Sequence, residues 1–433
     1  MKKLILGCTL FMLSIFLFAC GKENGKITDE DLDRDAATNQ TDDNEGSKTD
    51  VNIVRESNEE SNDVNKDEEN NTNEELSDEM NAVYTASSDN VKQLGRTYYS
   101  DKDILWCAFS GTGAEFKFTG KKCTVNITGD SVSLTNQTDN HARIGIYVNG
   151  NRVVDDMVDK WQKEYVVIDE DEITEATVRI VKLSETAMST FGIASIKVEE
   201  GKIEPTEEKN LFIEFIGDSI TCGYGVDDED RDHHFSTKTE DVTRAYAYKT
   251  AEKLDADYSM VAISGYGIIS GYTTADEPNS EQTIPQYYET LGFSYGGFGT
   301  EKPQDIKWDF SKRQPDIIVI NLGTNDNSYT KGIEDRVSLF GSEYGKFLKK
   351  VRELNPASTI ICSLGIMGGQ LYPTIENTVN AFINETGDNK IELLRFDEQS
   401  PQDGYAADWH PTEATHTKAS EKLAAKIREI LDK

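Results

Sequence analysis

The stretch Leu211-Phe212-Ile213-Glu214-Phe215-Ile216-Gly217-Asp218-Ser219-Ile220-Thr221 decides the fold, because it joins a strand to a tight turn. Residues 211–216 are rich in the β-branched and aromatic side chains that are typical of a buried strand. Gly217-Asp218-Ser219 follows at once and has the composition of a turn. A serine on the turn that leaves a buried strand lies at the carboxyl edge of the sheet, where parallel sheets bind ligands.

From residue 210 onward, strand-like and helix-like segments alternate. The predicted strands are residues 211–216, 258–264, 316–322, 359–365 and 391–396, and the predicted helices are 243–254, 343–354 and 412–431. Aliphatic strands that alternate with helices indicate a parallel sheet with helices on both faces. We therefore predict a three-layer α/β domain over residues 210–433.

Polar blocks follow two further strands and precede the last helix. Ser264-Gly265-Tyr266-Gly267 ends the second strand, Asn321-Leu322-Gly323-Thr324-Asn325-Asp326 ends the third, and Asp408-Trp409-His410-Pro411 stands before the terminal helix. Acyl transfer needs an activated hydroxyl and hydrogen-bond donors aimed at the developing oxyanion. With Gly217-Asp218-Ser219 as the first, these make four blocks. Together they contain residue types that can supply both the hydroxyl and the hydrogen-bond donors.

In this order, the four blocks resemble those of the SGNH, or GDSL-type, hydrolases, over essentially the whole α/β domain. The resemblance implies that Ser219 is the nucleophile and His410 the general base. It also implies an oxyanion hole made by the backbone N–H groups of Ser219 and Gly265 and by the side-chain amide of Asn325. Such a site is complete without a metal or an organic cofactor, and none is implied.

The assignment of His410 as the base is helped by the scarcity of histidine, since the chain has only five. His141 falls in the preceding domain, and His233-His234 lies in a charged loop that we interpret as a pocket rim. We interpret His416, inside the terminal helix, as a solvated position. His410 remains, and the proline after it fits the first turn of that helix.

The third member of the catalytic group is left open by the sequence. The SGNH pattern is Asp-x-x-His, but here the residue three before His410 is Ala407, and Asp408 lies two before it. Asp408 is one candidate for the acid of a triad. A backbone carbonyl that fixes the imidazole, which would give a Ser–His dyad, is the other.

Short β-like runs without helical periodicity precede the α/β domain. Asn149-Gly150 is a type I′ hairpin signal between two of them. We predict a small all-β sandwich or jelly roll over residues 92–200, and a polar joint over 201–209. Cys107 and Cys123 are the one cysteine pair close enough in sequence to suggest a disulfide. The predicted strands are residues 104–109, 114–118, 123–127, 144–148, 165–168, 177–181 and 193–198.

The first twenty residues have the pattern of an export signal. Lys2 and Lys3 precede an apolar run over residues 4–19, which is too short for a comfortable membrane span. Cys20 follows the run directly, and this arrangement resembles the lipobox of bacterial lipoproteins. The resemblance implies a lipid on Cys20 and a protein that faces the outside of a membrane. A plain signal peptide and a short anchor are the alternatives.

Residues 21–90 are acidic and poor in aromatic residues, and we predict a disordered tether there. Residues 22–90 hold 22 acidic and 6 basic residues, and the whole chain has a formal net charge of −34. This charge disfavours nucleic acid and anionic membrane surfaces as partners, so contact with a membrane is expected through the lipid anchor only. Neutral polymers such as polysaccharides remain open as partners.

A β-sandwich ahead of an SGNH domain, together with the blocks at Ser219 and His410, resembles family 2 of the carbohydrate esterases. Those enzymes remove O-acetyl groups from plant polysaccharides such as xylan and mannan. The resemblance implies that Trp409 and Tyr266 line the substrate pocket, although either side chain could equally serve packing. Two alternatives stay open, an esterase of the bacterium's own acetylated envelope polymers and a non-catalytic carbohydrate-binding lipoprotein.

Overall fold

The computed structural model describes residues 81–135 and 138–432. The predicted signal peptide (1–20) with its lipidation site Cys20, and the predicted tether as far as residue 80, lie outside these described residues. Within the described ranges, every helix is too short or too polar to cross a membrane.

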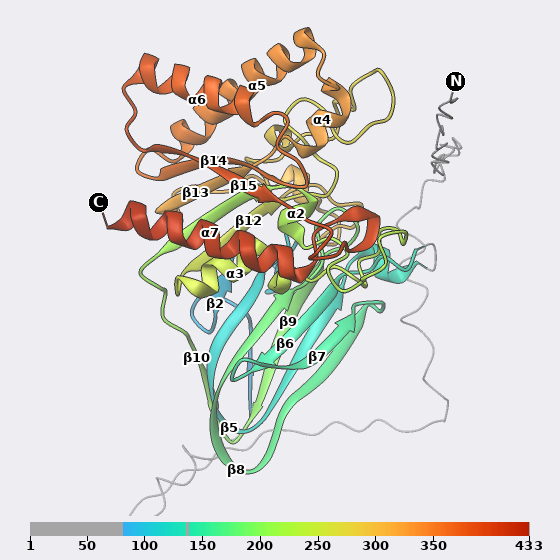
Figure 1. Ribbon diagram of the computed structural model, residues 1–433. Helices are drawn as coiled ribbons and strands as arrows, with labels where there is room; N and C mark the ends of the chain where they lie inside the picture. The colour runs from blue at the N-terminus through green and yellow to red at the C-terminus, as the bar shows by residue number, and fades with distance from the viewer. Residues whose placement is uncertain (1–80, 136–137, 433) are drawn as a thin grey trace, which may run out of the picture. The chain divides into compact units, whose positions relative to one another are not determined.

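The first domain is a ten-stranded sheet in which all pairs are antiparallel. Its strands, blue to green in Figure 1, bury their apolar residues in one shared core. The strands are β1 (Asn81–Tyr84), β2 (Lys92–Leu94), β3 (Thr97–Tyr99), β4 (Leu105–Cys107), β5 (Gly113–Gly129), β6 (Arg143–Val148), β7 (Asn151–Met157), β8 (Gln162–Lys182), β9 (Phe191–Glu199) and β10 (Lys202–Pro205); the 3-10 turn η1 spans Ser131–Leu134.

This domain differs from the sequence prediction at three places. Strand β10 pairs with β5, so residues that we predicted as a polar joint belong to the sheet. Strand β1 pairs with β9 and Tyr84 packs on the domain core, so the folded part already includes residues that we predicted as tether. Strands β5 and β8 each join two predicted strands, because polar residues between the apolar runs continue the ladder at a bulge near Gly120. The predicted type I′ hairpin is confirmed, since both Asn149 and Gly150 have positive φ between β6 and β7.

The second domain is built on a five-stranded, all-parallel sheet with the order β12-β11-β13-β14-β15. Its strands are β11 (Phe212–Gly217), β12 (Asp257–Ala262), β13 (Ile317–Asn321), β14 (Thr359–Ile366) and β15 (Ile391–Glu398). Its helices are α2 (Ser219–Cys222), α3 (Tyr246–Lys253), α4 (Thr324–Thr330), α5 (Glu334–Leu354), α6 (Tyr372–Thr386) and α7 (Glu413–Leu431), with 3-10 turns η2 (Val242–Arg244), η3 (Ile284–Gln286), η4 (Pro303–Asp305) and η5 (Ala407–Trp409).

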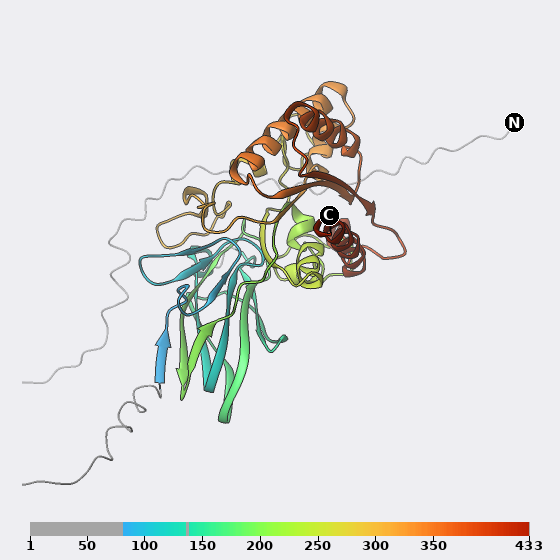
Figure 2. The same ribbon diagram turned by 90° about the vertical axis from the view of Figure 1, so that its left-hand side faces the viewer.

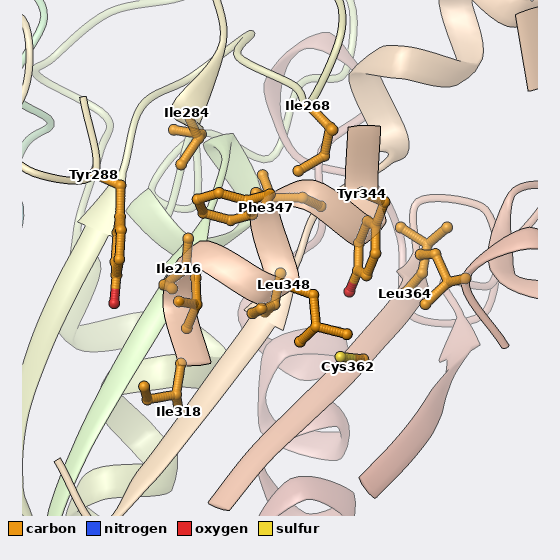
Figure 3. Packing of buried hydrophobic residues seen from close by; sticks show 14 of the residues in the cluster. Ile216, Ile268, Ile284, Tyr288, Ile318, Tyr344, Phe347, Leu348, Cys362 and Leu364 are labelled. Carbon is orange, nitrogen blue, oxygen red and sulfur yellow. The ribbon is translucent and has the colours of Figure 1, made fainter. Parts of the chain in front are cut away.

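Two helices cover each face of this sheet, as Figures 1 and 2 show: α5 and α6 lie on one face, and α3 and α7 lie on the other. On the α5 face, Phe347 and Leu348 pack against aliphatic side chains of β11 and β13 (Figure 3). Burying each such side chain contributes about 1.5–3 kcal/mol to stability. The three-layer α/β prediction is confirmed.

The order of the strands determines where on the sheet a ligand can bind. The chain runs from β11 outward to β12 and then crosses back to β13 on the other side of β11. Such a change of direction leaves a crevice beyond the carboxyl ends of the two neighbouring strands, and ligands bind there in open α/β sheets. Ser219 follows β11 and Asn325 follows β13, so both lie at this point.

The four cysteines of the described residues are free and buried. The disulfide that we considered between Cys107 and Cys123 is therefore wrong. Burial raises the pKa of both thiols to about 12, which leaves them as small apolar side chains with little reactivity.

Candidate active site

Ser219 is placed by a short, closely packed turn. Gly217 ends β11, and a Cβ on this residue would lie 2.1 Å from Oγ1 of Thr221, so only glycine fits. The Asp218 carboxylate then accepts a hydrogen bond from the Ile220 N–H at 3.0 Å and caps helix α2. Ser219 is the first residue of that helix, and the N–H groups of the three residues after it all donate to Asp218.

His410 reaches Ser219 from the other end of the chain. Its Nε2 lies 2.9 Å from the Ser219 Oγ, and its ring stacks on Tyr224 with the centroids 3.8 Å apart. The structure therefore brings together the two residues that the sequence pairs as nucleophile and base. Sequence reasoning missed Tyr224, although it stands in the same segment as Ser219.

The protonation state of His410 suits a general base. Its Nδ1 lies 3.2 Å from the carbonyl oxygen of Ala407. A carbonyl can only accept a hydrogen bond, so Nδ1 carries the proton and Nε2 is left to accept the proton of the serine. Burial lowers the pKa of His410 to about 4, so the ring is neutral at neutral pH.

Asp408 does not take the place of a triad acid. Its carboxylate accepts hydrogen bonds from the Tyr224 hydroxyl and from the Nδ1 of His234. The physical reason lies in the backbone: Asp408 and Trp409 both have positive φ, and this turn points the carboxylate toward Tyr224 while it brings the Ala407 carbonyl to the imidazole. Of the two alternatives that the sequence left open, the geometry favours the dyad.

We expect Asp408→Asn to lower kcat for p-nitrophenyl acetate by less than about 10-fold. In a triad, the same change removes the carboxylate that holds the histidine tautomer and costs about 10⁴-fold. Here the Ala407 carbonyl holds the tautomer, and the asparagine oxygen can still accept from Tyr224. Steady-state kinetics at neutral pH measures the effect, and a loss near 10⁴-fold would show that Asp408 acts as the acid.

The loop after β12 carries the second candidate oxyanion donor. Gly265 has a φ of +80°, which favours glycine. The loop is held by Asp326, whose carboxylate accepts from the N–H groups of Ile268, Ile269 and Ser270 at 2.7–3.2 Å. Asp326 is a functional neighbour that sequence reasoning missed, although it lies in the same block as Asn325.

Asn325, the third candidate donor, stands at the start of α4. Its Nδ2 donates to the Tyr266 carbonyl at 2.9 Å and lies 3.4 Å from a carboxylate oxygen of Asp218. The second contact is longer than an ordinary N–H···O hydrogen bond. One amide hydrogen is therefore weakly held and can turn toward an oxyanion beside Ser219.

The two predicted pocket aromatics differ in exposure. Tyr266 is 5 % exposed and packs against Tyr287, so its ring belongs to the core of the α/β domain. Trp409 is 41 % exposed, with the Arg231 guanidinium 4.2 Å above its ring. Tyr272 is also exposed, and its backbone N–H donates a hydrogen bond to the Gly265 carbonyl, which places Tyr272 beside the loop of the candidate oxyanion hole.

The remaining histidines lie partly as expected. His234 bonds to Asp408, which agrees with a position at the rim of the site. His416, which we interpreted as solvated, is fully buried, and its Nδ1 accepts from the Tyr246 N–H. The reason is its position on α7, three and seven residues before the buried Ala419 and Leu423, which places it on the apolar face.

Comparison with known proteins bears on this architecture. Residues 215–418 match the GDSL-like Lipase/Acylhydrolase family, and residues 93–206 match the Carbohydrate esterase 2 N-terminal domain. The chain has the two domains of a family 2 carbohydrate esterase. The α/β domain with Ser219 and His410 is its GDSL-type hydrolase domain, and the antiparallel domain is the one that accompanies it in this family.

The chain is 30 % identical over 347 residues to the cellulase/esterase CelE of Acetivibrio thermocellus, a match that covers 78 % of this chain and 39 % of CelE. The chain thus spans about two fifths of the length of CelE. It is 24 % identical over 373 residues to an acetylxylan esterase / glucomannan deacetylase of Cellvibrio japonicus, covering 82 % of this chain and 93 % of that protein.

Among solved structures, a family two carbohydrate esterase from Clostridium thermocellum in complex with cellohexaose has a TM-score of 0.67 at 28 % identity. The match covers 79 % of this chain and 99 % of that one. These relatives are named as esterases, and the solved structure shares the fold of this chain.

Proposed function

We propose that this family 2 carbohydrate esterase removes O-acetyl groups from polysaccharides of the xylan or mannan type. The observation that carries the proposal is the hydrogen bond of 2.9 Å between the Ser219 Oγ and the His410 Nε2, at the switch point of the sheet. The acetylxylan esterase and cellulase/esterase names of the relatives support the substrate class.

The proposed reaction uses the side chains in two half-reactions. The Ser219 oxygen attacks the acetyl carbonyl as its proton moves to the Nε2 of His410, and the sugar hydroxyl leaves with that proton. Water then attacks the acetyl-serine with His410 again as base, and acetate leaves. The N–H groups of Ser219 and Gly265 and the amide of Asn325 stabilise the oxyanion in both steps, and each donor is worth about 10²–10³ in rate.

Rates of acetate release test the substrate class. Acetylated xylan, acetylated glucomannan and O-acetylated peptidoglycan are each incubated with the wild-type protein and with Ser219→Ala as the blank. We expect faster release from the two plant polymers. Faster release from peptidoglycan would favour the envelope esterase, and a wild type that hydrolyses neither these polymers nor p-nitrophenyl acetate would favour the non-catalytic lipoprotein.

We further propose that the enzyme is held at the outer face of a membrane by lipid on Cys20, with residues 21–80 as the spacer. The apolar run that ends at Cys20 supports the anchor, and the acidic composition of the following residues supports the spacer. Cys20→Ser is expected to move the protein from the membrane fraction to a soluble one. Retention of this variant in the membrane fraction would contradict the lipid anchor.

A further inference from the structure

The antiparallel domain reaches the candidate oxyanion hole through the segment that follows β8. Glu185 lies in this segment, and its side chain is buried against the α/β domain. One of its carboxylate oxygens accepts a hydrogen bond of 2.6 Å from the N–H of Ser264. Ser264 directly precedes Gly265, so a side chain of the first domain is bonded one residue away from a candidate oxyanion donor.

The N–H of Gly265 lies in the peptide between Ser264 and Gly265, and hydrogen bonds hold the chain on both sides of it. On one side the Ser264 N–H donates to Glu185, and on the other the Gly265 carbonyl accepts from the Tyr272 N–H at 2.8 Å. Apart from Gly265 itself and its two chain neighbours, no described residue has an atom within 4 Å of the position that a Cβ on Gly265 would take. Packing does not fix this residue on that side, so the direction of its N–H depends on the hydrogen bonds of the chain around it. A longer bond of 3.3 Å from the Tyr266 N–H to the Ile263 carbonyl also closes this turn.

Glu185 is itself held firmly from both domains. Its N–H donates to a carboxylate oxygen of Glu240 at 3.0 Å, and its carbonyl accepts from the ammonium group of Lys182. The Arg143 guanidinium donates to the Glu240 carbonyl at 3.1 Å. These contacts fix the backbone from which the buried Glu185 side chain extends to Ser264.

The burial of Glu185 together with two other charged residues indicates that Glu185 has a role other than stabilising the fold. Lys182, Glu185 and Glu240 are all buried, with at most 1 % of each residue exposed. Burial lowers the pKa of Lys182 to about 8 and raises that of Glu185, which shows that the surroundings disfavour both charges. Buried ionic groups often stabilise a protein no more than apolar residues of the same size would. A buried carboxylate that bonds the backbone beside the active site is better explained by what it positions.

We propose that Glu185 is a positioning residue of the oxyanion hole, so that the antiparallel domain forms part of the active site. This inference rests on the proposed function, because it takes the Gly265 N–H as an oxyanion donor. Glu185 touches neither the substrate nor Ser219 in this role. It acts by holding the backbone from which Gly265 presents its N–H.

The test compares Glu185→Ala and Glu185→Gln with the matched control Glu115→Ala. Glu115 is a buried carboxylate of the same domain that pairs with Lys92 and Arg179, away from Ser219. Loss of a whole oxyanion donor costs about 10²–10³ in rate, so a donor that is only loosened is expected to cost about 10–100-fold. We expect Glu185→Ala to lower kcat for p-nitrophenyl acetate by that factor with little change in KM.

Glu185→Gln keeps an oxygen that can accept from Ser264, so its kcat is expected to return to within a few-fold of wild type. Glu115→Ala is expected to lower the melting temperature but to leave kcat per folded molecule unchanged. If Glu185→Ala does not fold, Glu185→Asp replaces it, because the shorter side chain withdraws the carboxylate from Ser264. Thermal unfolding and circular dichroism report the folded fraction of each variant.

A folded Glu185→Ala variant with the kcat of wild type would overturn the inference, and so would an equal loss of kcat in Glu115→Ala. If Glu185→Asp is the variant tested, a kcat equal to that of wild type overturns it in the same way. Failure of the proposed function is recognised separately, because it shows in the wild-type protein, which would then release acetate faster from peptidoglycan than from the plant polymers or hydrolyse no acetyl ester at all.

Discussion

Ser219→Ala is expected to lower kcat for p-nitrophenyl acetate by about 10⁵–10⁶-fold, the largest effect of any single change in the chain. Alanine lacks the Ser219 Oγ. Among the described residues, this is the only oxygen within hydrogen-bond reach of the His410 Nε2. The oxyanion donors and the binding site remain, so a small rate above the uncatalysed reaction is expected to survive.

Ser420→Ala is a matched control for this change. Ser420 is a buried serine of the same domain whose hydroxyl donates to the Thr417 carbonyl within α7. Its loss is expected to affect stability and to leave kcat within about twofold, since it is a hydrogen bond worth about 1 kcal/mol outside the site. Full activity in Ser219→Ala would show that another group is the nucleophile.

His410→Ala is expected to lower kcat by about 10⁴–10⁶-fold. Without the imidazole, the serine hydroxyl keeps its proton at neutral pH and the leaving alcohol has no acid. His233→Ala removes an exposed histidine of the rim that pairs with Asp228, and it is expected to change kcat only a few-fold. Steady-state rates of both variants decide the matter, and a His410→Ala enzyme with more than about 1 % of wild-type kcat would contradict the role of His410.

The parallel sheet could be predicted from the sequence, because buried aliphatic strands leave clear local patterns. The pairing of Ser219 with His410 was predicted from the resemblance to the SGNH hydrolases and from the scarcity of histidine in the chain. Helix α6 could not be predicted, since its threonine, asparagine and proline residues do not favour a helix. It is stabilised by the packing of Ile375 and Val379 on the core beside the sheet. The pattern of a segment alone does not show such tertiary contacts.

Other features of the site depend on side-chain orientations and on contacts between distant residues, which could not be predicted from the sequence. Asp408 is one residue away from the position of the acid in the SGNH pattern. The left-handed backbone at Asp408 and Trp409 determines where its carboxylate points. Glu185 and Ser264 are 79 residues apart and lie in different domains, so no local pattern joins them. His416 could have been placed correctly, because its spacing to Ala419 and Leu423 already puts it on the buried face of α7.

Covalent labelling by a fluorophosphonate, which reacts with activated serine hydroxyls, tests the Ser219–His410 pair most directly. After reaction, intact-mass measurement counts the adducts and peptide mapping locates them. The account predicts one adduct, on Ser219, that forms with loss of esterase activity, is absent in Ser219→Ala and forms far more slowly in His410→Ala. An adduct on another serine that abolishes activity, or unchanged labelling of Ser219 in His410→Ala, would contradict it.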